Sequence, residues 1–156
     1  MRFKKLDIQP NDRIHMTDSP KFNFIDQDID DNSMSGIGKP RGLWYSMGRE
    51  WMEWIEREKM DWWKKYIYKV EINSKKILFL DTERKVKLFS KAYQRPGYFS
   101  MNIHWGRIAE KYSGIEFNPY FWHLRFEIGL LWYYGIDVPS GCIWNKAGIK
   151  SITRLN

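Results

Sequence analysis

Hydrophobic and polar residues alternate along several short stretches of the chain, which is the pattern of half-buried β-strands. Residues 13–17 and 66–72 alternate most clearly. Shorter apolar runs predict further strands at residues 43–45, 76–80, 115–117, 142–144 and 149–153. Because only Asn73-Ser74-Lys75 separates 66–72 from 76–80, we expect these two strands to pair as a hairpin.

Four segments have the apolar spacing of an amphipathic helix. They are residues 48–63 after a Ser46 cap, 82–93 after a cap at Asp81 or Thr82, the segment between an Asn102 cap and Ser113-Gly114, and a segment that opens at Asn118-Pro119. In the third segment Trp105, Ile108 and Tyr112 lie on one helix face, and we expect them to be buried. Residues 128–138 fit either the end of a helix or a strand.

Together these elements predict an α+β fold with a small mixed, mostly antiparallel sheet and three to four helices. No βαβ alternation is long enough for a doubly wound sheet. A chain of 156 residues has the size of one ordinary domain, so residues 1–156 are expected to form a single domain. We expect a flexible N-terminus at residues 1–10 and a mobile acidic and Gly/Ser-containing loop at residues 26–38.

Charge is unevenly distributed along the chain. Residues 1–60 carry 10 Lys/Arg and 11 Asp/Glu, a net charge of −1, whereas residues 61–156 carry 16 and 8, a net charge of +8. A basic field favours nucleic acids and phosphorylated small molecules. The run Trp62-Trp63-Lys64-Lys65-Tyr66 interleaves rings with lysines, as single-strand-binding grooves do. One hypothesis is therefore a basic, aromatic-rich protein that binds nucleic acid or a partner without catalysis, for example a viral or phage accessory or structural protein.

Composition excludes several other classes of protein. Aromatic residues make up 17% of the chain, which argues against disorder. No apolar stretch is long enough to span a bilayer, and no apolar region follows the basic start of the chain, so we expect no membrane partner and no signal peptide. Cys142 is the only cysteine and fits a reducing, cytoplasmic location. The oligomeric state is left open.

Common catalytic motifs are absent from the sequence. It contains no P-loop, no GxGxxG after a strand, no HExxH and no GxSxG. Cys142 and the three histidines have no paired spacing, so no metal site is expected.

Three other segments carry candidate functional residues. His15-Met16-Thr17 ends the first predicted strand, Gly42-Leu43-Trp44-Tyr45-Ser46 is a glycine-led aromatic strand that runs into a helix, and Tyr133-Tyr134-Gly135-Ile136-Asp137 precedes the final strands. In order and residue type, these segments resemble the ADP-ribosyltransferase superfamily, in the branch that includes poly-ADP-ribose polymerases. The strand pair that follows the Trp-rich helix is also similar to that arrangement. The resemblance covers about half of the chain.

The resemblance implies a transferase, of the glycosyltransferase kind, that uses NAD as co-substrate and modifies a macromolecular acceptor, either protein or nucleic acid. The residues implied to bind NAD are His15, Thr17, Gly42, Tyr45 and Ser46. Among them, His15 and Thr17 match positions that hold the nicotinamide ribose and amide, and Tyr45 matches the ring that stacks on nicotinamide. A late carboxylate stabilises the positive charge that develops on the ribose as nicotinamide leaves. Asp137 and Glu116 are the two catalytic candidates.

The two strands that carry these residues predict a common cleft. Alternation places Leu43 and Tyr45 on one face of their strand and Trp44 on the other. If this strand pairs with residues 13–17, then Tyr45 and His15 lie on adjacent strands, and we expect them to border the same pocket.

Overall fold

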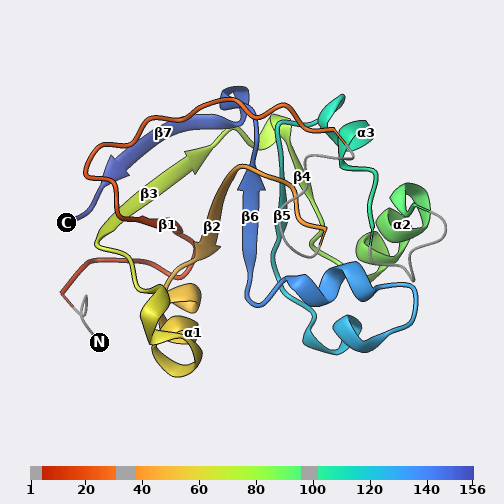
Figure 1. The fold of residues 1–156 in the computed structure, drawn as a ribbon, viewed down its shortest axis with the longest axis horizontal. Helices are drawn as coiled ribbons and strands as arrows, with labels where there is room; N and C mark the ends of the chain where they lie inside the picture. Colours follow the sequence, from red (N-terminus) through yellow and green to blue (C-terminus); the bar gives the residue numbers. More distant parts are fainter. Residues whose placement is uncertain (1–4, 31–37, 96–101) are drawn as a thin grey trace.

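Seven strands form one curled sheet in the computed structural model, which describes residues 5–30, 38–95 and 102–156 (Figure 1). The order across the sheet is β4-β5-β6-β2-β1-β3-β7; β4 and β5 are parallel, and every other neighbouring pair is antiparallel. The strands are β1 (Arg13–Thr17), β2 (Leu43–Met47), β3 (Tyr66–Ile72), β4 (Ile77–Phe79), β5 (Gly114–Phe117), β6 (Ser140–Ile143) and β7 (Ile149–Arg154). The predicted α+β class with a mostly antiparallel sheet is confirmed.

Three α-helices accompany the sheet in the described part of the chain. They are α1 (Glu50–Glu58), α2 (Glu83–Tyr93) and α3 (Trp105–Ala109). Short 3₁₀ segments complete the fold: η1 (Met60–Trp62), η2 (Ser74–Lys76), η3 (Trp122–Phe126), η4 (Leu131–Gly135) and η5 (Lys146–Gly148). As predicted, Thr82 caps α2, because its hydroxyl accepts a hydrogen bond from the Lys85 amide at 3.1 Å. Within the same described ranges, no helix has the length and apolar character needed to cross a bilayer.

The helix predicted for residues 48–63 is shorter than expected, and its cap is not Ser46. Ser46 lies inside β2, opposite Ser140 of β6, so its backbone belongs to the sheet ladder. Helix α1 starts after Arg49, without a side-chain cap, and ends before Lys59, whose backbone leaves the helical region at φ −147° and ψ 64°. Tertiary strand pairing therefore overrides the local capping signal of Ser46.

The hairpin predicted for residues 66–72 and 76–80 is wrong. Strand β3 pairs on one side with β1 and on the other with β7, so both of its edges are filled. Strand β4 pairs instead with β5, in parallel. A short turn allows a hairpin but does not require one when long-range partners bury more apolar surface.

No α-helix opens at Asn118-Pro119, and the Asn102 cap is also wrong. Several amides after Pro119 bond to the carbonyl of the third residue back, as in Leu124 to the Phe121 carbonyl at 3.0 Å, which is 3₁₀ geometry. The residue that precedes α3 is His104, not Asn102.

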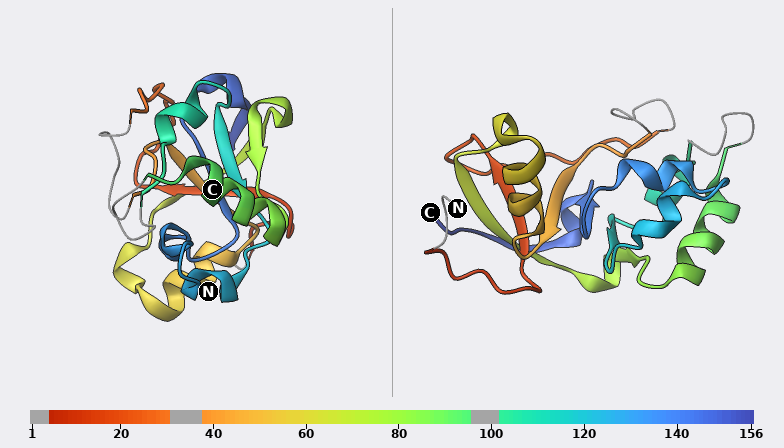
Figure 2. Two further views of the ribbon diagram at one scale, coloured as in Figure 1. Left: turned by 90° about the vertical axis from the view of Figure 1, so that its right-hand side faces the viewer. Right: turned by 90° about the horizontal axis from the view of Figure 1, so that it is seen from below.

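One face of the sheet is covered by the helices, in two clusters. The larger cluster packs α2, α3, η3 and η4 against β5 and β6, and the smaller packs Met52 of α1 on Ile14 and Ile67. Because Ile14 lies opposite Ser46 and Trp44 lies opposite Cys142, both clusters lie on the same face. Seen from below, α1 lies near one end of the molecule and α2 near the other (Figure 2). The part of this sheet face that lies between the two clusters is therefore not covered by either cluster, and a pocket forms there.

The opposite face carries a separate apolar layer. Leu43, Tyr45, Val70 and Ile143 form its centre, and Phe22 and Phe24 are among the side chains that pack against it. Alternation along β2 is as expected, since Leu43 and Tyr45 lie in this layer and Trp44 packs on the other face.

The face predicted for the third helix is buried. Trp105 is 2% exposed, Ile108 is fully buried and Tyr112 is partly buried. Trp105 also donates a hydrogen bond from Nε1 to the Gly38 carbonyl at 2.6 Å. The prediction of a buried face is confirmed for Trp105 and Ile108, although α3 itself is short.

Two segments expected to be loosely held make defined contacts where they are described. Of residues 1–10, positions 1–4 lie outside the described residues, while Leu6 and Ile8 pack against the cluster around Ile14. Of residues 26–38, positions 31–37 lie outside them, while the Gln27 amide donates to the Trp144 carbonyl at 2.8 Å.

Candidate functional site

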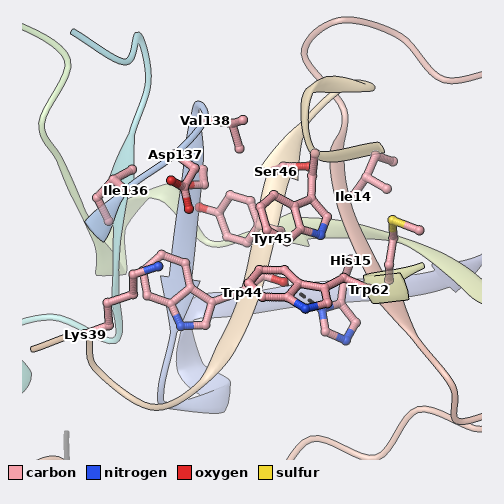
Figure 3. A pocket seen from close by; sticks show the side chains of 13 residues that line it. Ile14, His15, Lys39, Trp44, Tyr45, Ser46, Trp62, Ile136, Asp137 and Val138 are labelled. Carbon is pink, nitrogen blue, oxygen red and sulfur yellow. Dashed lines mark hydrogen bonds between the residues drawn. The ribbon is translucent and has the colours of Figure 1, made fainter. Parts of the chain in front are cut away.

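A pocket of about 370 Å³ opens on the helix-covered face, between the two apolar clusters (Figure 3). Its floor is β1 and β2, one wall is the Trp-rich segment of α1 and η1, and the other is the connection from η4 to β6. Residues from four separate parts of the sequence therefore meet here, and long-range strand pairing holds them together.

Four of the seven residues predicted for the site line this pocket. They are His15, Tyr45, Ser46 and Asp137. Strands β1 and β2 are neighbours, as predicted, with Arg13 opposite Met47 and Ile14 opposite Ser46. The remaining three, Thr17, Gly42 and Glu116, are not among the lining residues.

His15 is held by a hydrogen bond that fixes its tautomer. Its Nδ1 lies 2.6 Å from the Trp44 carbonyl oxygen. Because a carbonyl only accepts, Nδ1 carries the proton, and Nε2 is left as an acceptor. Burial lowers the pKa of His15 below its ordinary value, and the bond to Trp44 opposes this shift. The ring is therefore neutral at pH 7, and it protonates only at a pH below the ordinary histidine range.

Tyr45 borders the pocket without offering a free ring face. Its side chain is 2% exposed, and its hydroxyl donates a hydrogen bond to Glu116 Oε2 at 2.7 Å. Burial and the Glu116 charge raise the pKa of Tyr45 well above the usual value, so the phenol remains a donor. The rings available in the pocket instead belong to Trp44, Trp51 and Trp62.

The contribution of the Trp-rich segment to the pocket was missed, because helical spacing at Trp51 and Trp54 indicates a core stripe. In the structure Trp51 and Trp54 stack at 4.8 Å with an interplanar angle of 7°, and Trp62 packs beside both rings. Trp62 is 47% exposed. The signal that was available is the excess of tryptophan itself, since a core stripe does not need so many partly exposed rings.

Glu116 is part of a buried ion pair and does not line the pocket. It is 4% exposed and accepts hydrogen bonds from Arg13 Nε at 2.6 Å and Arg13 Nη2 at 3.2 Å, besides the one from Tyr45. This set satisfies both carboxylate oxygens. Its geometry assigns Glu116 a structural position that ties β5 to β1 and β2.

Gly141 makes this network possible. It lies between Tyr45 and Glu116 in the sheet register, and a Cβ atom there would collide with the Tyr45 hydroxyl and ring. We expect Gly141→Ala to lower the free energy of unfolding by about 1–3 kcal/mol, measured by urea denaturation. In a Tyr45→Ala background, Gly141→Ala should lower the free energy of unfolding much less, because the ring with which the new Cβ would collide is gone. Full additivity of the two changes would show that the collision is not the cause.

Asp137 and Lys39 stand at one end of the pocket as unpaired charges (Figure 3). Asp137 is partly buried, and neither a hydrogen bond nor an ion pair holds its carboxylate within residues 5–30, 38–95 and 102–156. Lys39 lies over the Trp44 ring, with Nζ 5.5 Å from the ring centroid. Sequence patterns did not indicate Lys39, because an isolated lysine before a Pro-Arg-Gly turn carries no distinguishing signal.

Gly42 and Thr17 have local structural contacts. A Cβ at Gly42 would collide with the Ile143 carbonyl, so glycine permits the close approach of β2 to β6. The Thr17 hydroxyl accepts a hydrogen bond from the Ser19 amide at 3.2 Å.

That the run Trp62-Trp63-Lys64-Lys65-Tyr66 binds nucleic acid or a partner stays a prediction. Trp63 packs against the cluster around Ile14, and Lys64 forms an ion pair with Asp18 at 2.8 Å. Cys142 is fully buried, and burial raises the pKa of its thiol. In the described ranges, no group of three or more His, Cys, Asp or Glu side chains is arranged to hold a metal ion.

Comparison with known protein families, curated proteins and solved structures gives no match to this chain, so its function is argued from the site alone.

Proposed function

We propose that the pocket binds NAD and that the protein is an ADP-ribosyltransferase-like enzyme that modifies a macromolecular acceptor. One observation carries the proposal: His15, Tyr45, Ser46 and Asp137, which the resemblance selects from distant parts of the sequence, border a single pocket, His15 and Tyr45 through the strands that form its floor. The volume of about 370 Å³ lies within the range of small-molecule sites. The free Cys142 fits a reducing compartment, and we propose a cytoplasmic location.

Asp137 is the carboxylate that fits the chemical step. When the bond between ribose C1′ and the nicotinamide nitrogen breaks, its electron pair goes to the ring nitrogen, and positive charge develops on the ribose. A fixed carboxylate stabilises that charge until the acceptor nucleophile forms the new bond to C1′ and loses its proton. Asp137 faces the pocket without a pairing group among the described residues, whereas Glu116 is already neutralised by Arg13.

The remaining residues of the pocket hold the ligand or support the floor beneath it. His15 supports the pocket floor, because its Nδ1–H bond to the Trp44 carbonyl links β1 to β2 while its ring packs against Phe22 on the other face of the sheet. Trp44, Trp51 and Trp62 supply aromatic surface for the nicotinamide, with Tyr45 and Ser46 behind them in β2. Holding the leaving group in this way reduces the entropy cost of the reaction.

The direct test is nicotinamide release. The purified protein is incubated with NAD, alone and with cell extract as a source of acceptors, and free nicotinamide is measured by chromatography. Radiolabelled NAD carrying the label on adenine follows the transferred group. We expect nicotinamide release together with label on a macromolecule. Absence of both release and NAD binding would overturn the proposal.

His15 gives a first test of the assigned roles. We expect His15→Ala to raise the KM for NAD about threefold to tenfold, because the hydrogen bond that holds the Trp44 backbone in the pocket floor is lost. His123→Ala is the matched control, since His123 is exposed and pairs with Glu83 outside the pocket. Initial rates over a range of NAD concentrations measure the effect. Equal kinetics of the His15 variant and wild type would contradict the role of His15.

A further inference from the structure

The unpaired cation at one end of the pocket has no role in the step described above. Lys39 is partly buried over the Trp44 ring, and neither a hydrogen bond nor an ion pair holds its ammonium within residues 5–30, 38–95 and 102–156. Its Nζ is not within ion-pair distance of Asp137, although the Asp137 charge acts on it. A partly buried ammonium that lacks an acceptor has lost hydration without compensation. An anion that enters the pocket would supply that compensation.

The backbone that carries Lys39 is fixed in place. Pro40, the next residue, is buried, and its carbonyl accepts a hydrogen bond from Trp44 Nε1 at 3.2 Å. The Cys142 thiol lies 3.8 Å from the same carbonyl. These contacts tie the start of β2 to β6, and the end of the Lys39 side chain lies against the Trp44 ring (Figure 3). These contacts hold the backbone of Lys39 beside the pocket, where its side chain is partly buried.

We propose that Lys39 forms a phosphate-binding subsite, so that the pocket selects a nicotinamide nucleotide over the corresponding nucleoside. This inference rests on the proposed function and names the part of the substrate that the pocket recognises. Oxidised nicotinamide nucleotides carry a cationic ring and, one ribose away, an anionic phosphate. The pocket offers the Asp137 carboxylate and the Lys39 ammonium, neither of which has an ion-pair partner among the residues that the structure describes. The cationic ring of the ligand complements the Asp137 carboxylate, and its phosphate complements the Lys39 ammonium. Lysine is a common partner of phosphate.

The test separates the phosphate from the rest of the ligand. Equilibrium binding of nicotinamide mononucleotide and of nicotinamide riboside, which differ by one phosphate, is measured by calorimetry for the wild type and for Lys39→Gln. We expect the wild type to bind the mononucleotide about tenfold more tightly than the riboside. Lys39→Gln should abolish that preference and leave riboside binding unchanged. Lys39→Arg should restore most of it, because the charge is retained.

Matched controls and a second ligand distinguish the possible failures. Arg41→Ala removes an exposed cation two residues away that does not line the pocket, and it should leave the preference intact. Thermal unfolding of each variant shows whether the fold is retained. Inorganic pyrophosphate is titrated in parallel as a ligand without nicotinamide.

Each outcome decides between the two proposals. A preference that persists in Lys39→Gln, or none in the wild type, overturns the phosphate subsite while leaving a nicotinamide pocket. Pyrophosphate binding that depends on Lys39, with no binding of either nicotinamide compound, supports the subsite and overturns the NAD assignment. Binding of none of the three ligands overturns both.

Discussion

Replacement of Asp137 by Asn is expected to reduce the rate of nicotinamide release by about 10²–10³-fold. The change keeps the size and shape of the side chain but removes the fixed negative charge that faces the pocket. Loss of one group that stabilises transition-state charge typically has an effect of about this size. Because the charge on the ribose is greatest in the transition state, kcat should fall far more than the affinity for NAD.

Single-turnover rates and NAD titrations measure the two quantities separately. Asp61→Asn serves as the control, because Asp61 lies in η1 beside Trp62, is exposed, and does not line the pocket. An Asp137→Asn enzyme with the wild-type rate would remove Asp137 as the catalytic carboxylate. An equal loss in kcat and in NAD affinity would indicate that Asp137 binds the cationic ring without acting in the chemical step.

Replacement of Glu116 by Ala is expected to lower the free energy of unfolding by about 3–5 kcal/mol. The substitution leaves the Arg13 guanidinium, which is 24% exposed, without its counterion, and leaves the buried Tyr45 hydroxyl without an acceptor. Breaking a buried pair by removing one partner has this size of effect because the other charge stays desolvated. The partial exposure of Arg13 places the expected value toward the lower end of that range.

Urea denaturation followed by tryptophan fluorescence measures this loss. Glu58→Ala is the matched control, since Glu58 pairs with Arg57 at the surface and should change stability by less than about 1 kcal/mol. If the free energy of unfolding of Glu116→Ala falls by less than about 1 kcal/mol, water replaces the lost carboxylate as the partner of Arg13 and Tyr45. A stable Glu116→Ala protein that releases no nicotinamide would instead assign the catalytic role to Glu116.

The two carboxylates illustrate how far the sequence leads at the candidate site. The resemblance leaves Asp137 and Glu116 as two candidates, because both are acidic residues in the later part of the chain. Their environments differ only in three dimensions. Glu116 lies in register with Gly141 and Tyr45 and within reach of Arg13, more than a hundred residues away, while Asp137 lies in the connection that borders the pocket.

Local signals were sufficient for elements whose structure depends on neighbouring residues. The alternation of residues 13–17 and 66–72 predicts β1 and β3 with the observed bounds, and Thr82 caps α2 as expected. Both signals act within a few residues, since side-chain direction along a strand and the first turn of a helix are set by adjacent backbone geometry. The α+β class follows from the same local elements.

Tertiary structure decided the strand partners, the role of Ser46 and the composition of the pocket. Ser46 is a strand residue because β6 pairs with β2, and β3 and β4 are not a hairpin because β1, β7 and β5 take their edges. The same pairing turns the Tyr45 ring toward Glu116 and leaves Trp44 to border the pocket. Such choices depend on apolar burial and charge pairing between segments far apart in the chain, which no local pattern of residues encodes.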